Sequence, residues 1–270
     1  MNRDSTAQTL LVATLLCVVC SVIVASAAVG LRHFQLENKQ LDQKKNVLIA
    51  AGLIEEGAAA SQQEIDRLFA EKIHRVLIDL KTGKVADSSV VDVENYDQRE
   101  AASDPAQSQS IEPAADLARI KRREKYAFVY EVVGAGGSVD QLVLPIYGKG
   151  LWSTLYGFLA LAADGNTVRG ITFYEHGETA GLGAEVENPK WRAIWPGKQV
   201  FDESGDIRLE VLKGHVSPTS PDVKYEVDGI SGATITSKGV SQLIRYWLGP
   251  DAFGPFLEQF HQQQDQFTDV

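Results

Sequence analysis

The stretch Asp228-Gly-Ile-Ser-Gly-Ala-Thr-Ile-Thr236 surrounds one threonine, Thr234, with small residues. Gly229 and Gly232 can adopt backbone angles that other residues avoid, and Ala233 adds only a methyl group. We therefore expect the Thr234 hydroxyl to be reachable by another protein's active site, with the charge of Asp228 nearby. The same composition is typical of a plain turn before a helix, so spacing alone leaves both interpretations open.

The residues after this stretch predict a helix. Five apolar residues have the spacing of one buried helical face: Val240, Leu243, Ile244, Trp247 and Leu248. Thr236 or Ser237 is expected to cap the helix, and Gly249-Pro250 to end it. The unpaired N–H groups at a helix start favour a phosphate. The stretch is not a Walker loop, because Gly-x-x-x-x-Gly-Lys-Ser/Thr does not occur in the chain.

Residues 228–234 resemble the flavinylation motif of FMN-binding domains. Three further runs match one family: Tyr147-Gly-Lys-Gly-Leu-Trp152, Phe173-Tyr-Glu-His-Gly-Glu-Thr-Ala-Gly-Leu-Gly183 and Trp247-Leu-Gly-Pro250. Together they resemble the C subunits of the sodium-translocating NADH:quinone oxidoreductase, over nearly the whole chain. The chain departs from the family pattern at Ala180, where proline is usual, so this loop is expected to be less rigid.

The resemblance implies an electron-carrying subunit of a respiratory enzyme complex, without a complete active site of its own. In this family a flavin transferase uses FAD to join FMN to the last threonine of the motif, here Thr234, by a phosphoester. Other membrane subunits of the complex are the implied partners. The further residues expected at the FMN site are Asp228, Ser231, Gly232, Ala233, Thr236, Glu178, Thr179, Gly181, Leu182 and Trp152.

Two other hypotheses stay open at this point. One is the G-type flavin subunit of an Rnf ferredoxin:NAD oxidoreductase, which carries a similar loop. The other is a membrane-anchored binding or scaffold protein without a redox role. The Gly-Leu-Trp run and the long region before the flavin motif favour the sodium pump.

Residues 178–183 are predicted to lie against the flavin ring. Their glycines permit close backbone approach, while Leu182 and the methyl group of Thr179 offer apolar surface. Trp152 is either part of the pocket wall or an ordinary core residue. Glu178 and Glu185 flank this loop, and we expect solvated carboxylates there rather than an acid/base pair.

Residues 9–31 contain no charged residue and are long enough to span a bilayer as a helix. The alternative is a cleaved signal peptide ending at Ala25-Ser26-Ala27, but the apolar run is long for one. Arg3 alone precedes the span while several basic residues follow it, which argues against export. The family resemblance nevertheless implies a single-pass protein of the bacterial inner membrane, with residues 1–8 cytoplasmic and the soluble part periplasmic.

The rest of the chain predicts an α+β fold, with a mainly antiparallel sheet and flanking helices. We expect a family-specific region over 32–140, with an extended and partly mobile excursion at 87–112, an FMN-binding domain over 141–260 and a tail over 261–270. Helices are expected over 36–51, 188–195 and 61–69, where Ser61 and Glu64 form a capping box. Strands are expected over 74–80, 127–133, 141–147, 155–162, 167–174, 207–212 and 224–227, and Asp164-Gly-Asn166 is a hairpin signal between the strands 155–162 and 167–174. The glycine-rich residues 134–137 lack the spacing of a dinucleotide-binding fingerprint.

The formal net charge is −10, and residues 1–31 contribute one Arg and one Asp. The acidic soluble part argues against nucleic acid or anionic lipid as a partner. One basic cluster is predicted to be a solvated helix face or loop: Arg119, Lys121, Arg122, Arg123 and Lys125. The only cysteines, Cys17 and Cys20, lie in the apolar span and do not suggest a redox pair. The five histidines are too dispersed for a metal site.

Overall fold

The computed structural model describes residues 5–55, 57, 59–134 and 136–268, and side chains as far as residue 262. Arg3, on which part of the charge argument rests, and Ala135 of the glycine-rich run lie outside the described residues, as does the end of the predicted tail at 269–270. The chain divides into two compact units, Met1–Gln43 and Lys44–Val270.

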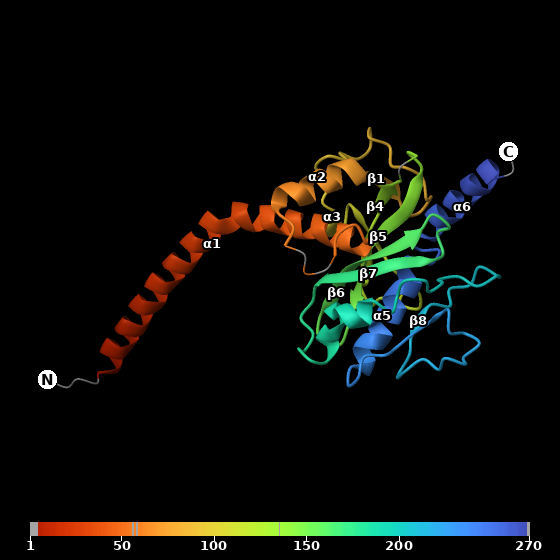
Figure 1. Ribbon diagram of the computed structural model, residues 1–270. Helices are drawn as coiled ribbons and strands as arrows, with labels where there is room; N and C mark the ends of the chain where they lie inside the picture. The colour runs from red at the N-terminus through yellow and green to blue at the C-terminus, as the bar shows by residue number, and fades with distance from the viewer. Residues whose placement is uncertain (1–4, 56, 58, 135, 269–270) are drawn as a thin grey trace. The chain divides into compact units, whose positions relative to one another are not determined.

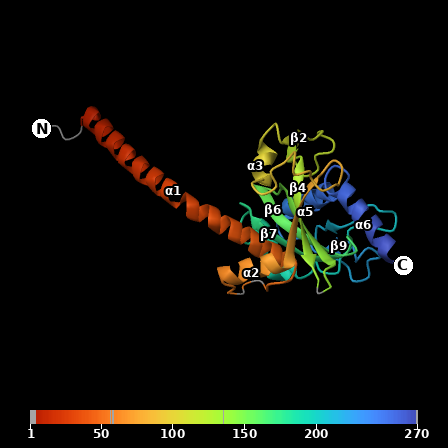
Figure 2. The ribbon, with the colours of Figure 1, turned by 90° about the horizontal axis from the view of Figure 1, so that it is seen from above.

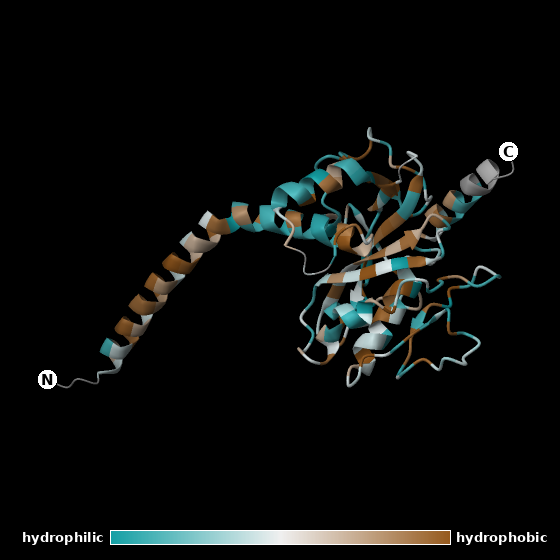
Figure 3. Ribbon diagram, in the orientation of Figure 1, coloured by the Kyte–Doolittle hydropathy of each residue, from teal (hydrophilic) through white to brown (hydrophobic). Residues whose placement is uncertain are grey.

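The first unit is the N-terminal part of helix α1 (Thr6–Ala50). Within the described residues, α1 is the one helix long and apolar enough to cross a membrane. Its apolar stretch stands out as a nearly continuous brown band in Figure 3. The helix predicted over 36–51 is the continuation of α1, and it ends before Gly52, whose φ is +69°.

The centre of the second unit is a five-stranded antiparallel sheet with the strand order β1-β4-β5-β6-β7 (Figure 1). Its strands are β1 (Ile73–Asp79), β4 (Tyr126–Val133), β5 (Val139–Lys149), β6 (Thr154–Ala162) and β7 (Val168–Glu175). The predicted α+β class with a mainly antiparallel sheet is confirmed. Strands from both predicted regions, 32–140 and 141–260, pair within this one sheet.

Helices cover the two faces of the sheet, as the ribbon turned by 90° also shows (Figure 2). On one face, the end of α1 and Phe69 of α2 (Gln62–Lys72) pack against Val143 and Phe158. Ser61 caps α2 by accepting from the N–H of Glu64, as the sequence predicts. On the other face, α5 (Thr234–Trp247) and α6 (Gly254–Thr268) pack over the main core.

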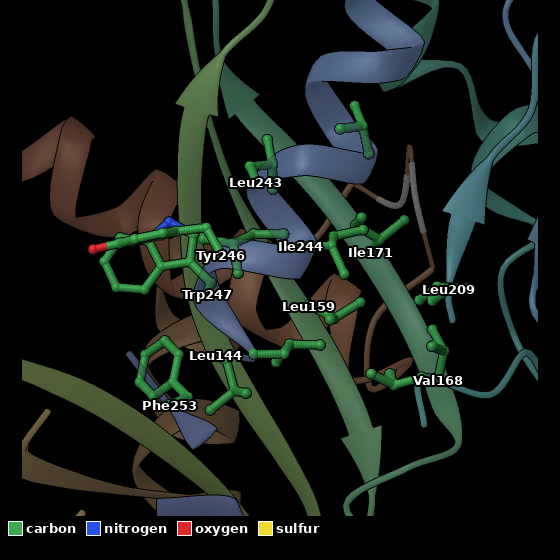
Figure 4. Packing of buried hydrophobic residues seen from close by; sticks show 14 of the residues in the cluster. Leu144, Leu159, Val168, Ile171, Leu209, Leu243, Ile244, Tyr246, Trp247 and Phe253 are labelled. Carbon is green, nitrogen blue, oxygen red and sulfur yellow. The ribbon is translucent and has the colours of Figure 1, made fainter. Parts of the chain in front are cut away.

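Trp247 fixes the end of α5 to the sheet. It is fully buried, and its indole N–H donates to the Tyr147 carbonyl at 2.6 Å. Figure 4 shows Leu243, Ile244 and Trp247 of α5 among Leu144 and Leu159 of the sheet. The apolar spacing read from the sequence thus faces the core, and α5 ends at Trp247, before Gly249-Pro250.

Four short elements lie near α5 and the loop before it. They are a 3₁₀ turn, η1 (Gly183–Glu187), helix α4 (Pro189–Arg192) and a parallel pair, β8 (Glu210–Val211) with β9 (Glu226–Val227). Asn188 caps α4 by accepting from the N–H of Lys190. The predicted helix over 188–195 and strands over 207–212 and 224–227 are present but shorter.

Residues 87–112, for which the sequence predicts an extended and partly mobile excursion, include short regular elements. They contain α3 (Gln98–Ser103) and β2 (Ser108–Ser110), which pairs with β3 (Arg122–Glu124). Four aspartates organise this segment, because each carboxylate accepts from the backbone N–H two residues ahead: Asp87, Asp92, Asp97 and Asp104. Because aspartate side chains hold these turns, the segment needs no regular spacing of apolar residues. Its polar composition therefore gives no sign of the local structure.

The basic cluster, predicted to be a solvated helix face or loop, is only partly so: Arg119, Lys121 and Lys125 are exposed outside the strands. Arg122 and Arg123 lie in β3, and the Arg123 side chain is buried with its guanidinium donating to the Glu124 carbonyl at 2.9 Å. Arg119 has φ 56°, and its guanidinium donates to the carbonyls of Lys149 and Gly150. Arg119 therefore holds another segment in place, whereas Arg123 is bonded to the residue that follows it.

Glu124 gives the fold a pH-dependent stability. Its buried carboxyl group accepts from Tyr147 Oη at 2.6 Å and Gln98 Nε2 at 2.5 Å, and burial raises its pKa to about 7. Because its pKa is raised in the folded chain, the stabilisation that the protonated Glu124 contributes to the free energy of unfolding is complete below the usual glutamate pKa, about 4.3. That stabilisation is lost as the pH rises toward 7. Glu124→Gln should remove this decline in urea unfolding measured across that range. The exposed Glu112→Gln is the control, and an equal decline in both variants would contradict the prediction.

Candidate functional site

Thr234 is the first residue of α5 and is exposed. The prediction that Thr236 or Ser237 caps the helix is wrong, because α5 begins earlier and Ala233 precedes it without a side-chain cap bond. Both hydroxyls are buried and have partners elsewhere in the fold. Thr236 Oγ1 donates to Glu178 Oε2 at 2.7 Å, and Ser237 Oγ accepts from the N–H of Ile230 at 3.1 Å.

The loop before α5 is held by Asp228. Its carboxylate accepts from the N–H of Val216 at 2.7 Å and lies 3.0 Å from His215 Nδ1, and these contacts lower its pKa. Its carbonyl accepts from the indole N–H of Trp191 at 2.8 Å. Asp228 therefore connects the loop to two neighbouring segments. Ser231 and Gly232 remain exposed next to Thr234, while Ala233 is buried.

Glu178 is not a solvated carboxylate. Its side chain is 8% exposed and accepts from three successive N–H groups, those of Leu151 at 3.2 Å, Trp152 at 2.9 Å and Ser153 at 3.1 Å. Burial raises its pKa, but the bonds from Thr236 and from these N–H groups outweigh burial and hold the pKa below its usual value. Glu185 accepts from Asn188 Nδ2 at 2.5 Å instead.

Three glycines allow these segments to approach. A Cβ atom at Gly150 would lie 2.7 Å from Glu178 Oε1, and one at Gly183 would lie 2.7 Å from Thr236 Oγ1. At Gly239 of α5, a Cβ atom would lie 2.5 Å from the carbonyl oxygen of Lys149. The turn at 150–153, the loop at 178–183 and the start of α5 therefore meet at one place, which any larger side chain would open.

Apolar side chains around this meeting point face outward. Trp152 is 73% exposed and Leu182 is 42% exposed, so neither is an ordinary core residue. Leu182 lies beside the loop of Thr234, because a Cβ atom at Gly232 would be 2.8 Å from Leu182 Cδ2. Leu151 and Ile235 are exposed as well. Ordinary folding buries such side chains, so their exposure beside Thr234 indicates a ligand or partner surface.

The loop between Glu178 and Leu182 is a compact turn. The Thr179 carbonyl accepts from the N–H groups of Leu182 and Ala184, each at 3.1 Å, and Gly181 has φ +74°. Thr179, Ala180 and Gly181 are exposed. The structure thus brings together the predicted residues of the 178–183 loop, Trp152 and the start of α5, whereas the Asp228 side chain faces His215 and Val216.

Sequence reasoning missed several supporting residues. Ser153 Oγ accepts from the N–H of Gly177 at 2.6 Å, and Arg119 donates to the carbonyl of Gly150 at 2.8 Å. Gly150 lies within a run already used for the resemblance, but no local pattern signals that it approaches Glu178. Residues so far apart in the chain produce no repeating sequence pattern that would reveal their contact.

Comparisons with known proteins identify the family of the chain. Residues 150–249 match the family model described as the FMN-binding domain. The C subunit of the Na(+)-translocating NADH-quinone reductase of Pseudomonas aeruginosa is 50% identical over 256 residues, which cover 95% of this chain and 96% of that protein. The corresponding protein of Haemophilus ducreyi is 47% identical, and the match covers 96% of both chains.

The chain belongs to this family of C subunits. The crystal structure of Shewanella oneidensis NqrC has 37% sequence identity and a TM-score of 0.74, and the match covers 83% of this chain and 99% of that one. Membership of the family sets aside the Rnf-type and scaffold hypotheses.

The residues at the meeting point fit FMN. Thr234 offers an exposed hydroxyl at a helix start, where the N–H groups not bonded within the helix suit a phosphate. Trp152, Leu182 and Ile235 offer exposed apolar surface for a ring system. Glycines keep the adjoining backbone free of side chains.

Proposed function

We propose that the chain is the electron-carrying subunit of a sodium-translocating NADH:quinone reductase and holds FMN through a phosphoester on Thr234. One observation carries the assignment to this residue. Thr234 is exposed at the first position of α5, whereas Thr236, two residues later, is buried and bonded to Glu178. A modifying enzyme reaches the first hydroxyl without disturbing the fold, and the second only by breaking a buried hydrogen bond.

FMN supplies the capacity to accept and release electrons one at a time. The chain's own residues attach it, cover part of its ring and set its surroundings. Thr234 is the proposed point of attachment, and Ser231, Gly232 and Ala233 surround that point. Trp152, Leu182 and the methyl group of Thr179 are the proposed apolar contacts, and Gly181 leaves room beside them. In this proposal no side chain transfers a proton to a substrate.

A covalent bond suits a flavin that cannot be replaced from the cytoplasm. We propose that a flavin transferase forms the bond from FAD, and that electrons arrive from one subunit of the complex and leave to another. The related proteins are each named as one subunit of such a complex, which supports other subunits as partners. Because α1 is long and apolar enough to span a membrane, it is the proposed contact with the membrane part of the complex.

Mass spectrometry of the native protein tests the attachment. The chain is isolated from its own membranes, denatured and digested, and the peptide containing 228–236 is sequenced. The proposal requires the mass of FMN on Thr234. FMN on Thr236, or a wholly unmodified peptide, would contradict it.

The proposed topology is one uncleaved helix with Lys44–Val270 in the periplasm. Protease added outside intact spheroplasts should therefore digest that unit, and a cytoplasmic marker protein should survive in the same sample. Protection of the unit would reverse the orientation. A mature N-terminus at Ala28 would instead identify the helix as a signal peptide.

A further inference from the structure

We propose that Glu178 is a positioning residue, which fixes the turn at 150–153 and thereby holds the backbone of the exposed Trp152 next to the first turn of α5, where Thr234 lies. This inference rests on the proposed function for its consequence, though not for its geometry. Glu178 uses both carboxylate oxygens within the protein. Oε1 accepts from the N–H groups of Trp152 and Ser153, and Oε2 from Leu151 N–H and the Thr236 hydroxyl.

The turn at 150–153 has few other constraints on its exposed side. The N–H of Gly150 donates to the Ser153 carbonyl at 2.9 Å, and Arg119 donates to the Gly150 carbonyl at 2.8 Å. The Trp152 side chain itself is 73% exposed, so packing does not set its position. The backbone of the turn therefore sets where the Trp152 side chain begins, and three successive N–H groups of that turn donate to one carboxylate.

The hydrogen bond from Thr236 connects Glu178 to helix α5. Thr236 lies in the first turn of α5, two residues after Thr234, and its side chain is fully buried. Glu178 thus joins the backbone that carries Trp152 to the helix turn that carries the acceptor threonine. A negatively charged acceptor strengthens all four bonds relative to neutral ones.

The isosteric change Glu178→Gln tests the role. It keeps the shape and one acceptor oxygen, but replaces the other with an NH₂ group that cannot accept. Hydrogen exchange of the Trp152 and Ser153 amides, followed by NMR on the full isotope-labelled chain in detergent, should accelerate by roughly ten- to a hundredfold, the factor for bonds to a charged group. In the unaltered chain these amide signals should shift only in acid below the usual glutamate pKa, about 4.3.

The flavin provides the second measurement. In the flavinylated full chain, Glu178→Gln should change the flavin absorption spectrum in the same direction as Trp152→Ala. Combining the two changes should add little to Trp152→Ala alone, since the carboxylate acts through the indole. Glu185→Gln, which alters a nearby carboxylate bonded to Asn188, is the matched control and should leave both measurements unchanged.

Two outcomes would overturn the inference. Unchanged amide exchange in Glu178→Gln would mean that the turn does not depend on the carboxylate. Faster exchange with an unchanged flavin spectrum, in protein whose FMN is verified on Thr234, would mean that Glu178 does not position Trp152 for the cofactor. Failure of the proposed function is distinguishable, because FMN would then be missing from Thr234 while the amide result still stands. If Glu178→Gln fails to fold, Thr236→Val, which removes one donor, replaces it with the same readouts.

Discussion

Thr234→Ala should abolish covalent FMN while leaving the fold intact. The substitution removes the only oxygen through which the proposed phosphoester can form at this position. It removes no buried contact, because Thr234 is exposed. We therefore expect complete loss of flavin fluorescence from the denatured chain on a gel, with a change of less than about 0.5 kcal/mol in the free energy of unfolding.

Thr219→Ala is the matched control for this experiment. Thr219 is also an exposed threonine of the same unit, but it lies outside residues 228–236. This variant should retain its full content of FMN when expressed with the flavin transferase. Covalent flavin on the Thr234→Ala chain, or its loss from Thr219→Ala, would show that attachment does not depend on this hydroxyl.

Of the substitutions proposed for this chain, Trp247→Ala should cause the largest decrease in the free energy of unfolding. The side chain is fully buried between Tyr147, Tyr246 and Phe253, with ring centroids 4.8, 5.5 and 5.6 Å away, and its N–H is bonded. Truncation leaves a cavity and an unsatisfied Tyr147 carbonyl, which together should cost about 3–5 kcal/mol. Chemical denaturation of the full chain in detergent measures this change.

Trp152→Ala makes the same chemical change at an exposed position. Since its ring is 73% exposed, we expect a cost below about 0.5 kcal/mol in protein without flavin. Because the chemical change is the same in both variants, the difference between their free energies of unfolding measures the effect of burial. A similar loss in both variants would contradict the division between a core tryptophan and a site tryptophan.

The sequence predicted elements whose signals are local. The apolar spacing of α5, the capping serine of α2 and the Asp-Gly-Asn hairpin between β6 and β7 each involve residues within one or two turns of each other. Their positions could therefore be read directly. The parallel pairing of β8 with β9 could not, because two short strands separated by a loop carry no distinguishing period.

The residues of the candidate site also fall into those that the sequence predicts and those that it does not. The small residues around Thr234 made its exposure predictable, and the resemblance supplied Leu182 and Trp152. The roles of Thr236 and Glu178 were misread, since a hydroxyl and a carboxylate in a polar loop are usually solvent-facing or capping groups. Only their distance in space, 2.7 Å across 58 positions of the chain, explains their burial.

The aspartate turns of residues 87–104 have a consequence for how the chain reaches its fold. β1 pairs with β4, and the connection between them must close before that pairing forms. Closing a long flexible loop costs conformational entropy and slows folding. Each aspartate bonds within two residues of itself, so these turns can form early, while the sheet is still unpaired. They leave fewer freely rotating residues between the two strands, so a segment whose composition is typical of disorder lowers the entropic cost of pairing β1 with β4.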